Sequence, residues 1–183
     1  KDVATRQCSI SLAQRVINIA RKMGPSFNHG SMPKVILHPG GMSLNGYPGA
    51  NGMTGRFIDS LRRLDATGVE VLLENLPPFP WYFGGQWTGY LFLDGEEIRD
   101  FCEETGFKIC LDTSHAQLYC KHVGKDIVSF VRAVKPYIRH LHVADAHGVH
   151  GEGVQFGEGE IPFDQVFQEL KDYDEGFVPE IWR

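Results

Sequence analysis

Long hydrophobic runs and an excess of positive charge are both missing from the sequence. No stretch of about 18 consecutive apolar residues occurs, which argues against a membrane-spanning helix. The opening residues, KDVATRQCSISLAQRV, lack the continuous apolar core of a signal peptide, so we expect no membrane association. Lysine and arginine number 18 against 23 acidic residues, giving a formal charge of −5. This acidic balance argues against nucleic acid as a partner.

Cysteine is scarce and shows no metal-binding spacing. The four cysteines, at positions 8, 102, 110 and 120, include no CxxC pair, and Cys110 lies within an apolar run. Their separations of 94, 8 and 10 residues fit no pattern of paired zinc ligands. We therefore expect reduced thiols in a cytoplasmic protein, with no zinc site built from cysteine.

Short apolar runs alternate with amphipathic stretches along almost the whole chain. The apolar runs predict strands at 33–41, 69–75, 107–115, 138–146 and 177–182. The amphipathic stretches predict helices at 11–24, 55–68, 94–106, 124–138 and 162–176. This alternation predicts parallel βα units in an α/β fold, either an open doubly wound sheet or a (β/α) barrel. No GxGxxG follows the first strand, so the dinucleotide-binding form of the open sheet has no support.

One polar residue stands at or near the carboxyl end of each predicted strand. The series is His38, Glu74, Asp112, His142 and Glu180, with spacings of 36, 38, 30 and 38 residues. A complete barrel of about 250 residues has roughly 31 residues per βα unit, so spacings of this size place one such polar residue in each unit. In a barrel the carboxyl ends of the strands converge on one face, where active sites are built. The five side chains would then meet in one ring.

The ring contains only histidines and carboxylates, a composition that favours a metal site. Three carboxylates facing one another repel strongly unless a cation lies between them. Imidazole nitrogen and carboxylate oxygen together suit a divalent ion such as Mn²⁺, Co²⁺ or Zn²⁺, with Mg²⁺ as a further candidate. A lone histidine or glutamate at a strand end is more often a cap or a solvated loop residue. The recurrence in phase with the repeat is what favours the metal.

The motifs LLEN, CLDTSHA, HVADA and GEGEI, within a stretch that runs from LHPGG to PEIW, resemble those of the xylose isomerase-like TIM barrels. This superfamily comprises sugar isomerases and epimerases and also endonuclease IV, of AP endonuclease family 2. The resemblance implies a (β/α)8 barrel with a divalent metal held by Glu74, Asp112, His142 and Glu180. It also implies that His115 contacts substrate.

The family barrel has eight strands, whereas the sequence shows five. The chain begins before a helix and stops after the strand that carries Glu180, so it resembles about strands four to eight. We expect residues 1–183 to form a single, partial barrel domain that is incomplete at both ends. An open five-stranded piece would expose apolar edges and faces. A longer chain, or a second copy in a homo-oligomer, would complete it.

The expected reaction is isomerisation or epimerisation of a small-molecule sugar or sugar phosphate. A divalent ion that binds adjacent carbonyl and hydroxyl oxygens acidifies the C–H between them and stabilises an ene-diolate. Glu74 and Glu180 would flank the reacting carbon as catalytic acid and base, and His115 would orient a substrate hydroxyl.

Three residues besides His115 are candidates for substrate binding. His38 lies in the HPG turn after the first strand. Trp81 lies in the aromatic-rich segment 77–90, where it could line a sugar pocket or close the barrel mouth. Glu158 lies in the segment 151–163, where it could hydrogen-bond in the site or approach the following helix.

Two other functions are compatible with the same residues. An endonuclease IV-like zinc phosphodiesterase acting on abasic DNA is supported by His38 and His115. The Asp-x-His pair that holds the third zinc in that family falls on Gly151 and Gly153, and the neighbouring candidates to replace it are His147, His150 and Glu152. The third alternative is a non-catalytic half-barrel that serves as a binding or assembly module, favoured by the missing strands and opposed by the intact ligand set.

Overall fold

A five-stranded parallel sheet forms the centre of the fold, in a computed structural model that describes residues 3–26, 32–44 and 52–182. Its strand order is β1-β3-β7-β8-β11, and every neighbouring pair is parallel. The strands are β1 (Lys34–Leu37), β3 (Glu70–Glu74), β7 (Lys108–Asp112), β8 (Ile138–Val143) and β11 (Phe177–Pro179). Spatial order follows chain order, so each unit adds its strand beside the previous one, as in a (β/α) barrel.

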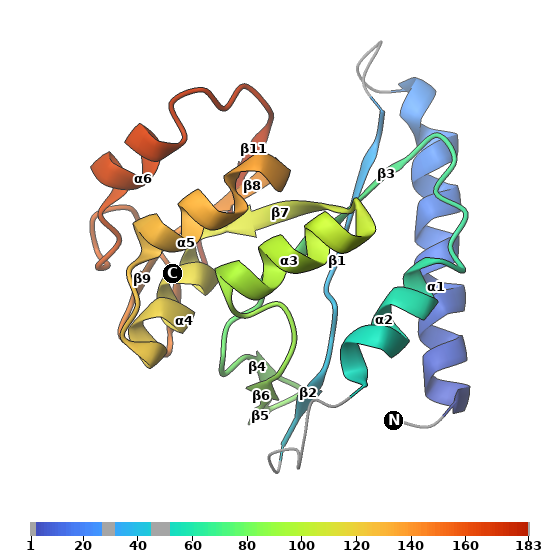
Figure 1. Cartoon of the computed structure of the whole chain (residues 1–183), viewed down its shortest axis with the longest axis horizontal. Coiled ribbons are helices and arrows are strands. Elements are labelled where there is room, and N and C mark those ends of the chain that lie inside the picture. Colours follow the sequence, from blue (N-terminus) through green and yellow to red (C-terminus); the bar gives the residue numbers. More distant parts are fainter. Residues whose placement is uncertain (1–2, 27–31, 45–51, 183) are drawn as a thin grey trace.

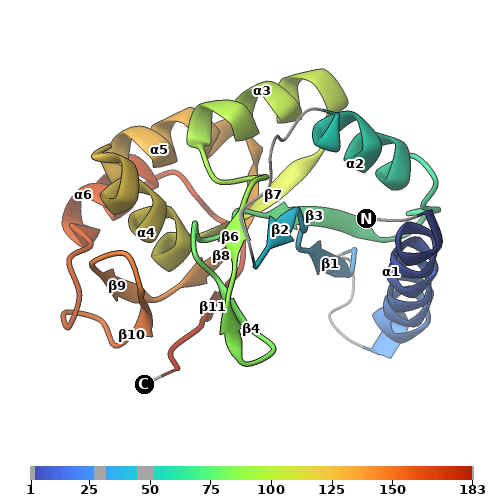
Figure 2. The same cartoon turned by 90° about the horizontal axis from the view of Figure 1, so that it is seen from below.

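Helices cover one face and one edge of this sheet. Helix α1 (Val3–Met23) lies beside the edge strand β1, where Ile17 packs with Val35 (Figure 1). Figure 2 shows the remaining helices in an arc around one face of the sheet. They are α2 (Met53–Leu61), α3 (Gly95–Thr105), α4 (Thr113–Val123), α5 (Ile127–Val134) and α6 (Phe163–Glu169), with short 3-10 turns η1 (Gly24–Ser26) and η2 (Lys135–Tyr137).

Within the described residues, three two-stranded antiparallel sheets lie in the loops that follow the strands. They pair β2 (Met42–Ser43) with β6 (Thr88–Gly89), β4 (Trp81–Tyr82) with β5 (Gly85–Gln86), and β9 (Asp145–His147) with β10 (Gly151–Val154). Because these segments come after β1, β3 and β8, they lie at the carboxyl end of the main sheet. That end is where a barrel carries its functional loops.

Alternating side chains divide the central strand between the two faces of the sheet. Ile109 and Leu111 are fully buried in the main core, which they share with the outer helices. The intervening residues Cys110 and Asp112 face the other way, toward the concave inside, because successive side chains of a strand point to opposite faces. The outer face therefore supplies the hydrophobic core, and the inner face supplies polar groups.

The parallel βα architecture and the partial barrel are confirmed. Within the described residues, β1 and β11 each pair on one side only, so the sheet is an open half-barrel. Several predicted elements differ in extent. The helices predicted for 55–68, 124–138 and 162–176 are shorter and end at Leu61, Val134 and Glu169. The first helix begins at Val3 rather than residue 11, and the strand predicted for 107–115 ends at Asp112, just before α4. The Asp112 side chain accepts the His115 N–H and so caps this helix, which the sequence pattern had not separated from the strand.

Two other findings concern the described chain as a whole. None of its helices is long and apolar enough to cross a membrane. All four cysteines are free thiols, of which Cys8 is exposed and the other three are buried.

Truncation of a buried side chain on the outer face should destabilise the fold. Leu111→Ala removes a fully buried side chain from the central strand, and we expect a loss of about 2–5 kcal/mol in the free energy of unfolding, measured by urea denaturation. The matched control, Leu12→Ala on α1, alters a side chain that is 59% exposed and should change the free energy by less than about 0.5 kcal/mol. Equal effects for the two variants would contradict this assignment of the core.

Candidate metal centre

The four residues expected to hold a metal lie together at the carboxyl end of the sheet. Glu74 and Asp112 are the last residues of β3 and β7. His142 is the penultimate residue of β8, directly opposite Asp112 in the register, and Glu180 follows β11. One potential ligand atom from each of the four lies within 4.8 Å of the others. A single ion could therefore contact all four side chains.

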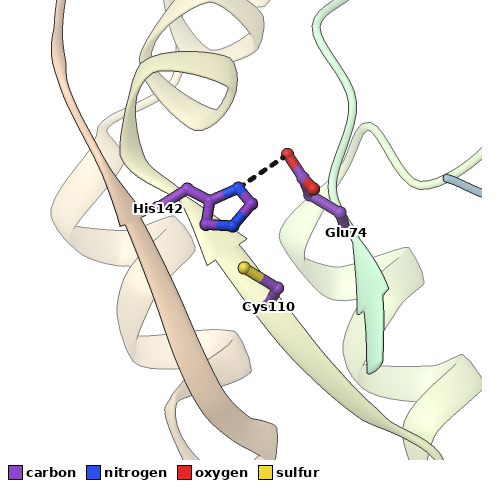
Figure 3. Close-up of side chains that lie close together, drawn as sticks. All are labelled: Glu74, Cys110 and His142. Carbon is purple, nitrogen blue, oxygen red and sulfur yellow. Dashed lines mark ion pairs between the residues drawn. The ribbon is translucent and has the colours of Figure 1, made fainter. Parts of the chain in front are cut away.

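The His142 imidazole has an unpartnered nitrogen aimed into this cluster. Its Nδ1 atom is buried and has no hydrogen-bond partner among the described residues. Glu74 Oε1 lies 3.4 Å from this nitrogen and Glu180 Oε2 lies 3.3 Å from it. Figure 3 shows the imidazole of His142 and the carboxylate of Glu74 facing each other from separate strands. A buried nitrogen that faces two carboxylates without a hydrogen bond fits a divalent cation between them.

Asp112 is fixed by the residue that follows Glu74. The Asn75 side-chain nitrogen donates to the Asp112 carbonyl at 2.9 Å, and the Asp112 N–H donates to Asn75 Oδ1 at 2.8 Å. Asp112 Oδ1 accepts the His115 N–H at 2.7 Å, which leaves the second carboxylate oxygen for a ligand. Asn75 was missed in the sequence, although its position in the LLEN motif beside Glu74 was a usable signal.

Glu74 is the most closely surrounded of the carboxylates. His38 Nε2 lies 3.2 Å from its Oε2, and His115 Nδ1 lies 3.5 Å from its Oε1. Burial acts to raise the pKa of Glu74, but the imidazoles of His142 and His38 outweigh burial and lower that pKa to about 2. Glu74 is therefore a carboxylate at neutral pH. The structure brings two histidines to the same carboxylate: His38, a member of the strand-end series, and His115, which lies outside that series.

Asp112 has the opposite balance. Burial raises the pKa of its carboxyl group to about 6, against the influence of His115, and the negative charge of Glu74 contributes in the same direction as burial. Burial disfavours the ionised form of this carboxyl group, and a bound cation would stabilise that form. The raised pKa of Asp112 and the His142 nitrogen without a hydrogen bond therefore both indicate a cation site.

Cys110 offers a second combination of ligand atoms beneath the first. Its sulfur, with Glu74 and His142, also forms a group whose atoms lie within 4.8 Å of one another, and Figure 3 shows it between those two side chains. Burial, followed by the charge of Glu74, raises the pKa of this thiol. A neutral thiol is a poor ligand because the thiolate is the metal-binding form. The carboxylates of Asp112 and Glu180 are therefore the better partners for an ion.

His115 is held at both ends of its ring. Its Nδ1 donates to the Asn75 carbonyl oxygen at 2.8 Å, and its Nε2 lies 3.1 Å from Glu152 Oε1. Burial acts to lower the pKa of His115, but the charges of Asp112 and Glu152 outweigh burial and raise that pKa to about 10. No spacing in the sequence indicated the contact with Glu152.

The other candidates for substrate binding lie farther out. Trp81 is 66% exposed on the short β4–β5 hairpin. Burial raises the pKa of the hydroxyl group of its neighbour Tyr82, and the charges of Glu152 and Glu74 raise that pKa further. Glu158 is exposed, and its backbone N–H donates to the Gln155 carbonyl.

Asp145, a residue that the sequence did not single out, anchors the loop that carries Glu158. Asp145 Oδ2 accepts the N–H groups of Gly157 and Gly159, each at 3.0 Å, and its Oδ1 accepts the Ile161 N–H at 3.1 Å. This buried carboxylate therefore organises the GEG segment by backbone hydrogen bonds. A charged residue inside the apolar HVADA run was the signal that could have found it.

The two glycines at the expected third-zinc positions leave no room for side chains. A Cβ atom at Gly151 would overlap His147, and one at Gly153 would overlap the indole of Trp182. Of the three candidate replacements, only Glu152 contacts the ring of site residues. His147 is exposed, and His150 Nδ1 lies 3.0 Å from Gln86 Nε2 on the β5 strand.

Comparison with known proteins yields one family and a set of solved relatives. The family model described as "Xylose isomerase-like TIM barrel" matches residues 1–183. The uncharacterized protein MJ1614 of Methanocaldococcus jannaschii is 24% identical over 169 residues, which cover 91% of this chain and 58% of that protein.

Among solved structures, a D-tagatose 3-epimerase-like protein has a TM-score of 0.74 at 21% identity, over 97% of this chain and 64% of its own. The D-allulose 3-epimerase from Methylomonas sp., solved with D-allulose, has a TM-score of 0.71 at 18% identity, over 100% of this chain and 58% of its own. Endonuclease IV from Thermus thermophilus has a TM-score of 0.54 at 22% identity, over 93% and 61%. At these identities the likeness is one of fold, and the chain spans about three fifths of the length of these proteins.

A divalent ion should bind at the cluster and stabilise the fold. We expect added Mn²⁺, Co²⁺ or Zn²⁺ to raise the unfolding temperature, with a gain of about 2.7 kcal/mol at 100 times the dissociation constant. Asp112→Asn should remove most of this shift, because the amide can still cap the His115 N–H but lacks the charge that binds the ion. The surface control Asp59→Asn should keep the whole shift. Equal metal-induced shifts in the two variants, measured by thermal denaturation, would argue against this site.

Proposed function

The chain belongs to the xylose isomerase-like TIM barrel family, and from this premise we propose that it is a divalent-metal-dependent isomerase or epimerase acting on a sugar or sugar phosphate. The observation that carries the proposal is the convergence of Glu74, Asp112, His142 and Glu180 from four neighbouring strands, with ligand atoms within 4.8 Å of one another. The epimerases of like fold, one of them solved with D-allulose, support sugar as the substrate class.

Those four residues are the ones that would hold the ion. The unpartnered His142 Nδ1 and the carboxylates around it form a nitrogen and oxygen donor set of the kind that divalent metals take. When bound, such an ion polarises a carbonyl group and so makes the adjacent C–H more acidic. The protein's own contribution is to orient the substrate and to move the proton.

Two carboxylates of the cluster are suited to moving the proton between the faces of the reacting carbon. The side chain of Glu180 is 30% exposed, whereas that of Glu74 is 2% exposed. We therefore assign to Glu180 the acceptance of the proton from substrate carbon. Glu74, which is ionised in the free site, would take a proton from a protonated neighbour such as His115, whose Nδ1 lies 3.5 Å from its Oε1, and would deliver that proton on the opposite side. A general base must reach its proton within hydrogen-bond distance, and the more open carboxylate meets that requirement more readily.

His115 and His38 would orient substrate beside these carboxylates. The hydrogen bond from His115 Nδ1 to the Asn75 carbonyl oxygen fixes the orientation of the imidazole ring in the site. His38 lies on the other side of Glu74, with a side chain that is partly open to solvent. Fixed donors on either side of the proton-transferring groups reduce the entropy cost of reaching the reactive arrangement.

Removal of the charge at Glu180 should separate binding from turnover. Glu180→Gln retains the shape of the side chain but cannot accept a proton, so we expect kcat for ketose epimerisation to fall by about 10²–10⁴. Substrate affinity, measured by calorimetry, should change far less. Glu104→Gln on the exposed face of α3 is the matched control and should leave kcat unchanged. Unaltered turnover in Glu180→Gln would exclude this residue from proton transfer.

A zinc-dependent phosphodiesterase of the endonuclease IV type is the second candidate function. It is favoured by His38, which contacts Glu74 at 3.2 Å, and by the solved endonuclease IV of similar fold. It is disfavoured by the tight packing at Gly151 and Gly153, which leaves no place for the residues that would hold a third zinc. A non-catalytic half-barrel is the third candidate.

Metal stoichiometry and activity together distinguish these three functions. We expect elemental analysis to find one divalent ion per chain and the metal-loaded protein to epimerise or isomerise a ketose. Two or three zinc ions per chain, with cleavage of an abasic DNA duplex, would instead identify a nuclease. No bound ion and no activity in either assay would leave the binding module as the function.

A further inference from the structure

The β9–β10 hairpin aims a carboxylate at the site through an irregularity in its pairing. Gly151 pairs with His147 and Val154 pairs with Asp145, so the register shifts across the two residues between them, Glu152 and Gly153. A bulge of this kind redirects a side chain and is frequent beside active sites. Glu152 is the residue that this bulge turns toward the ring of strand-end residues.

The bulge is held rigidly on both sides. Gly153 adopts a φ of 66°, its N–H donates to Ser114 Oγ at 3.0 Å, and its carbonyl accepts the Trp182 N–H at 2.8 Å. A left-handed φ and the close approach of the Trp182 indole both require glycine at this position. Glu152 is therefore placed by backbone contacts to α4 and to the segment after β11, not by a free loop.

Glu152 contacts His115, the histidine that also lies beside Glu74. Its Oε1 atom lies 3.1 Å from His115 Nε2, on the opposite side of the ring from the Asn75 carbonyl. Its side chain is 35% exposed, so a ligand entering the site can touch it. Burial acts to raise the pKa of Glu152, but the contact with His115 outweighs burial and lowers that pKa.

Carboxyl groups give the site a negative character once Glu152 is included. Glu74, Asp112, Glu180 and Glu152 contribute four of them, whereas a divalent ion would supply two positive charges.

Cationic side chains do not balance this charge in the described part of the chain. The ion pairs of Glu74, Glu152 and Glu180 there are all with histidines. The described lysines and arginines that form ion pairs do so with other carboxylates, such as Lys34 with Glu175 near the opposite end of the sheet and Lys121 with Glu160. A phosphate dianion is bound in proteins by such cations or by backbone N–H clusters.

We infer that Glu152 is a substrate-binding residue whose carboxylate, beside His115, accepts a hydrogen bond from a hydroxyl group of an uncharged sugar and disfavours a phosphorylated one. This inference rests on the proposed function and narrows its substrate class. A carboxylate is a strong acceptor for sugar hydroxyls and repels a phosphate group at short range. Glu152 thus selects the substrate, while the strand-end residues act on it.

The charge of Glu152 can be removed with little change of shape. For wild-type protein loaded with Mn²⁺, we expect kcat/KM for D-allulose to exceed that for its 6-phosphate ester. In Glu152→Gln this preference should fall by about tenfold or more, because the repulsion of the phosphate is relieved. Glu152→Ala should raise KM for D-allulose by about tenfold with a smaller change in kcat, since it removes one hydrogen bond to the substrate.

Control measurements separate a binding role from a structural one. Metal content and unfolding temperature of Glu152→Gln should match those of wild type, and Glu104→Gln should retain the wild-type preference. An unchanged preference in Glu152→Gln, or a wild-type protein that favours the phosphate ester, would overturn the inference and leave the proposed function intact. Absence of both turnover and calorimetric binding for either sugar in the metal-loaded protein would overturn the proposed function and the inference with it.

Discussion

The mutual repulsion of carboxylates buried at one end of a parallel sheet is the constraint around which this structure is organised. Glu74 and Asp112 are almost fully buried, and Glu180 closes the same cluster. Burying such groups together is unfavourable unless opposite charge and hydrogen bonds compensate. The contacts of His38 and His115 with Glu74 supply part of that compensation. His142 Nδ1 lies near two carboxylates without a hydrogen bond and marks the place where a cation would supply the rest.

The elements around the cluster serve folding and site geometry at the same time. Asp112 ends a strand, caps the helix that follows and offers an oxygen to the centre of the cluster. Asn75 ties the backbone of Asp112 to the neighbouring strand and also fixes the His115 ring. Asp112 and Asn75 each serve both the fold and the site, so an error in the sheet register would misplace the metal ligands. The register is in turn held by the hydrophobic outer face of the sheet.

The repeat of the sequence was sufficient to predict the parallel sheet and the meeting of the strand-end residues. Both follow from local periodicity and from the rule that parallel strands end at a common edge. The contacts of Asn75, Asp145 and Glu152 could not be predicted in the same way. Their side chains are directed by a bulge, a helix cap and backbone hydrogen bonds between distant segments, and such features leave no period in the sequence.

The strand-end residues, which the sequence predicts, and the loop residues, which it does not, have different roles in the site. The strand ends carry groups that must meet at fixed distances, so they are placed by the regular register of the sheet. Glu152, which would distinguish one substrate from another, lies on the hairpin after β8 and contacts His115 beside the cluster. Loops on a rigid scaffold can vary without disturbing the centre that they surround. The strand-end cluster is therefore placed by the fold that this chain shares with its family. We expect the features that set the substrate preference of this particular chain to lie on the β9–β10 bulge.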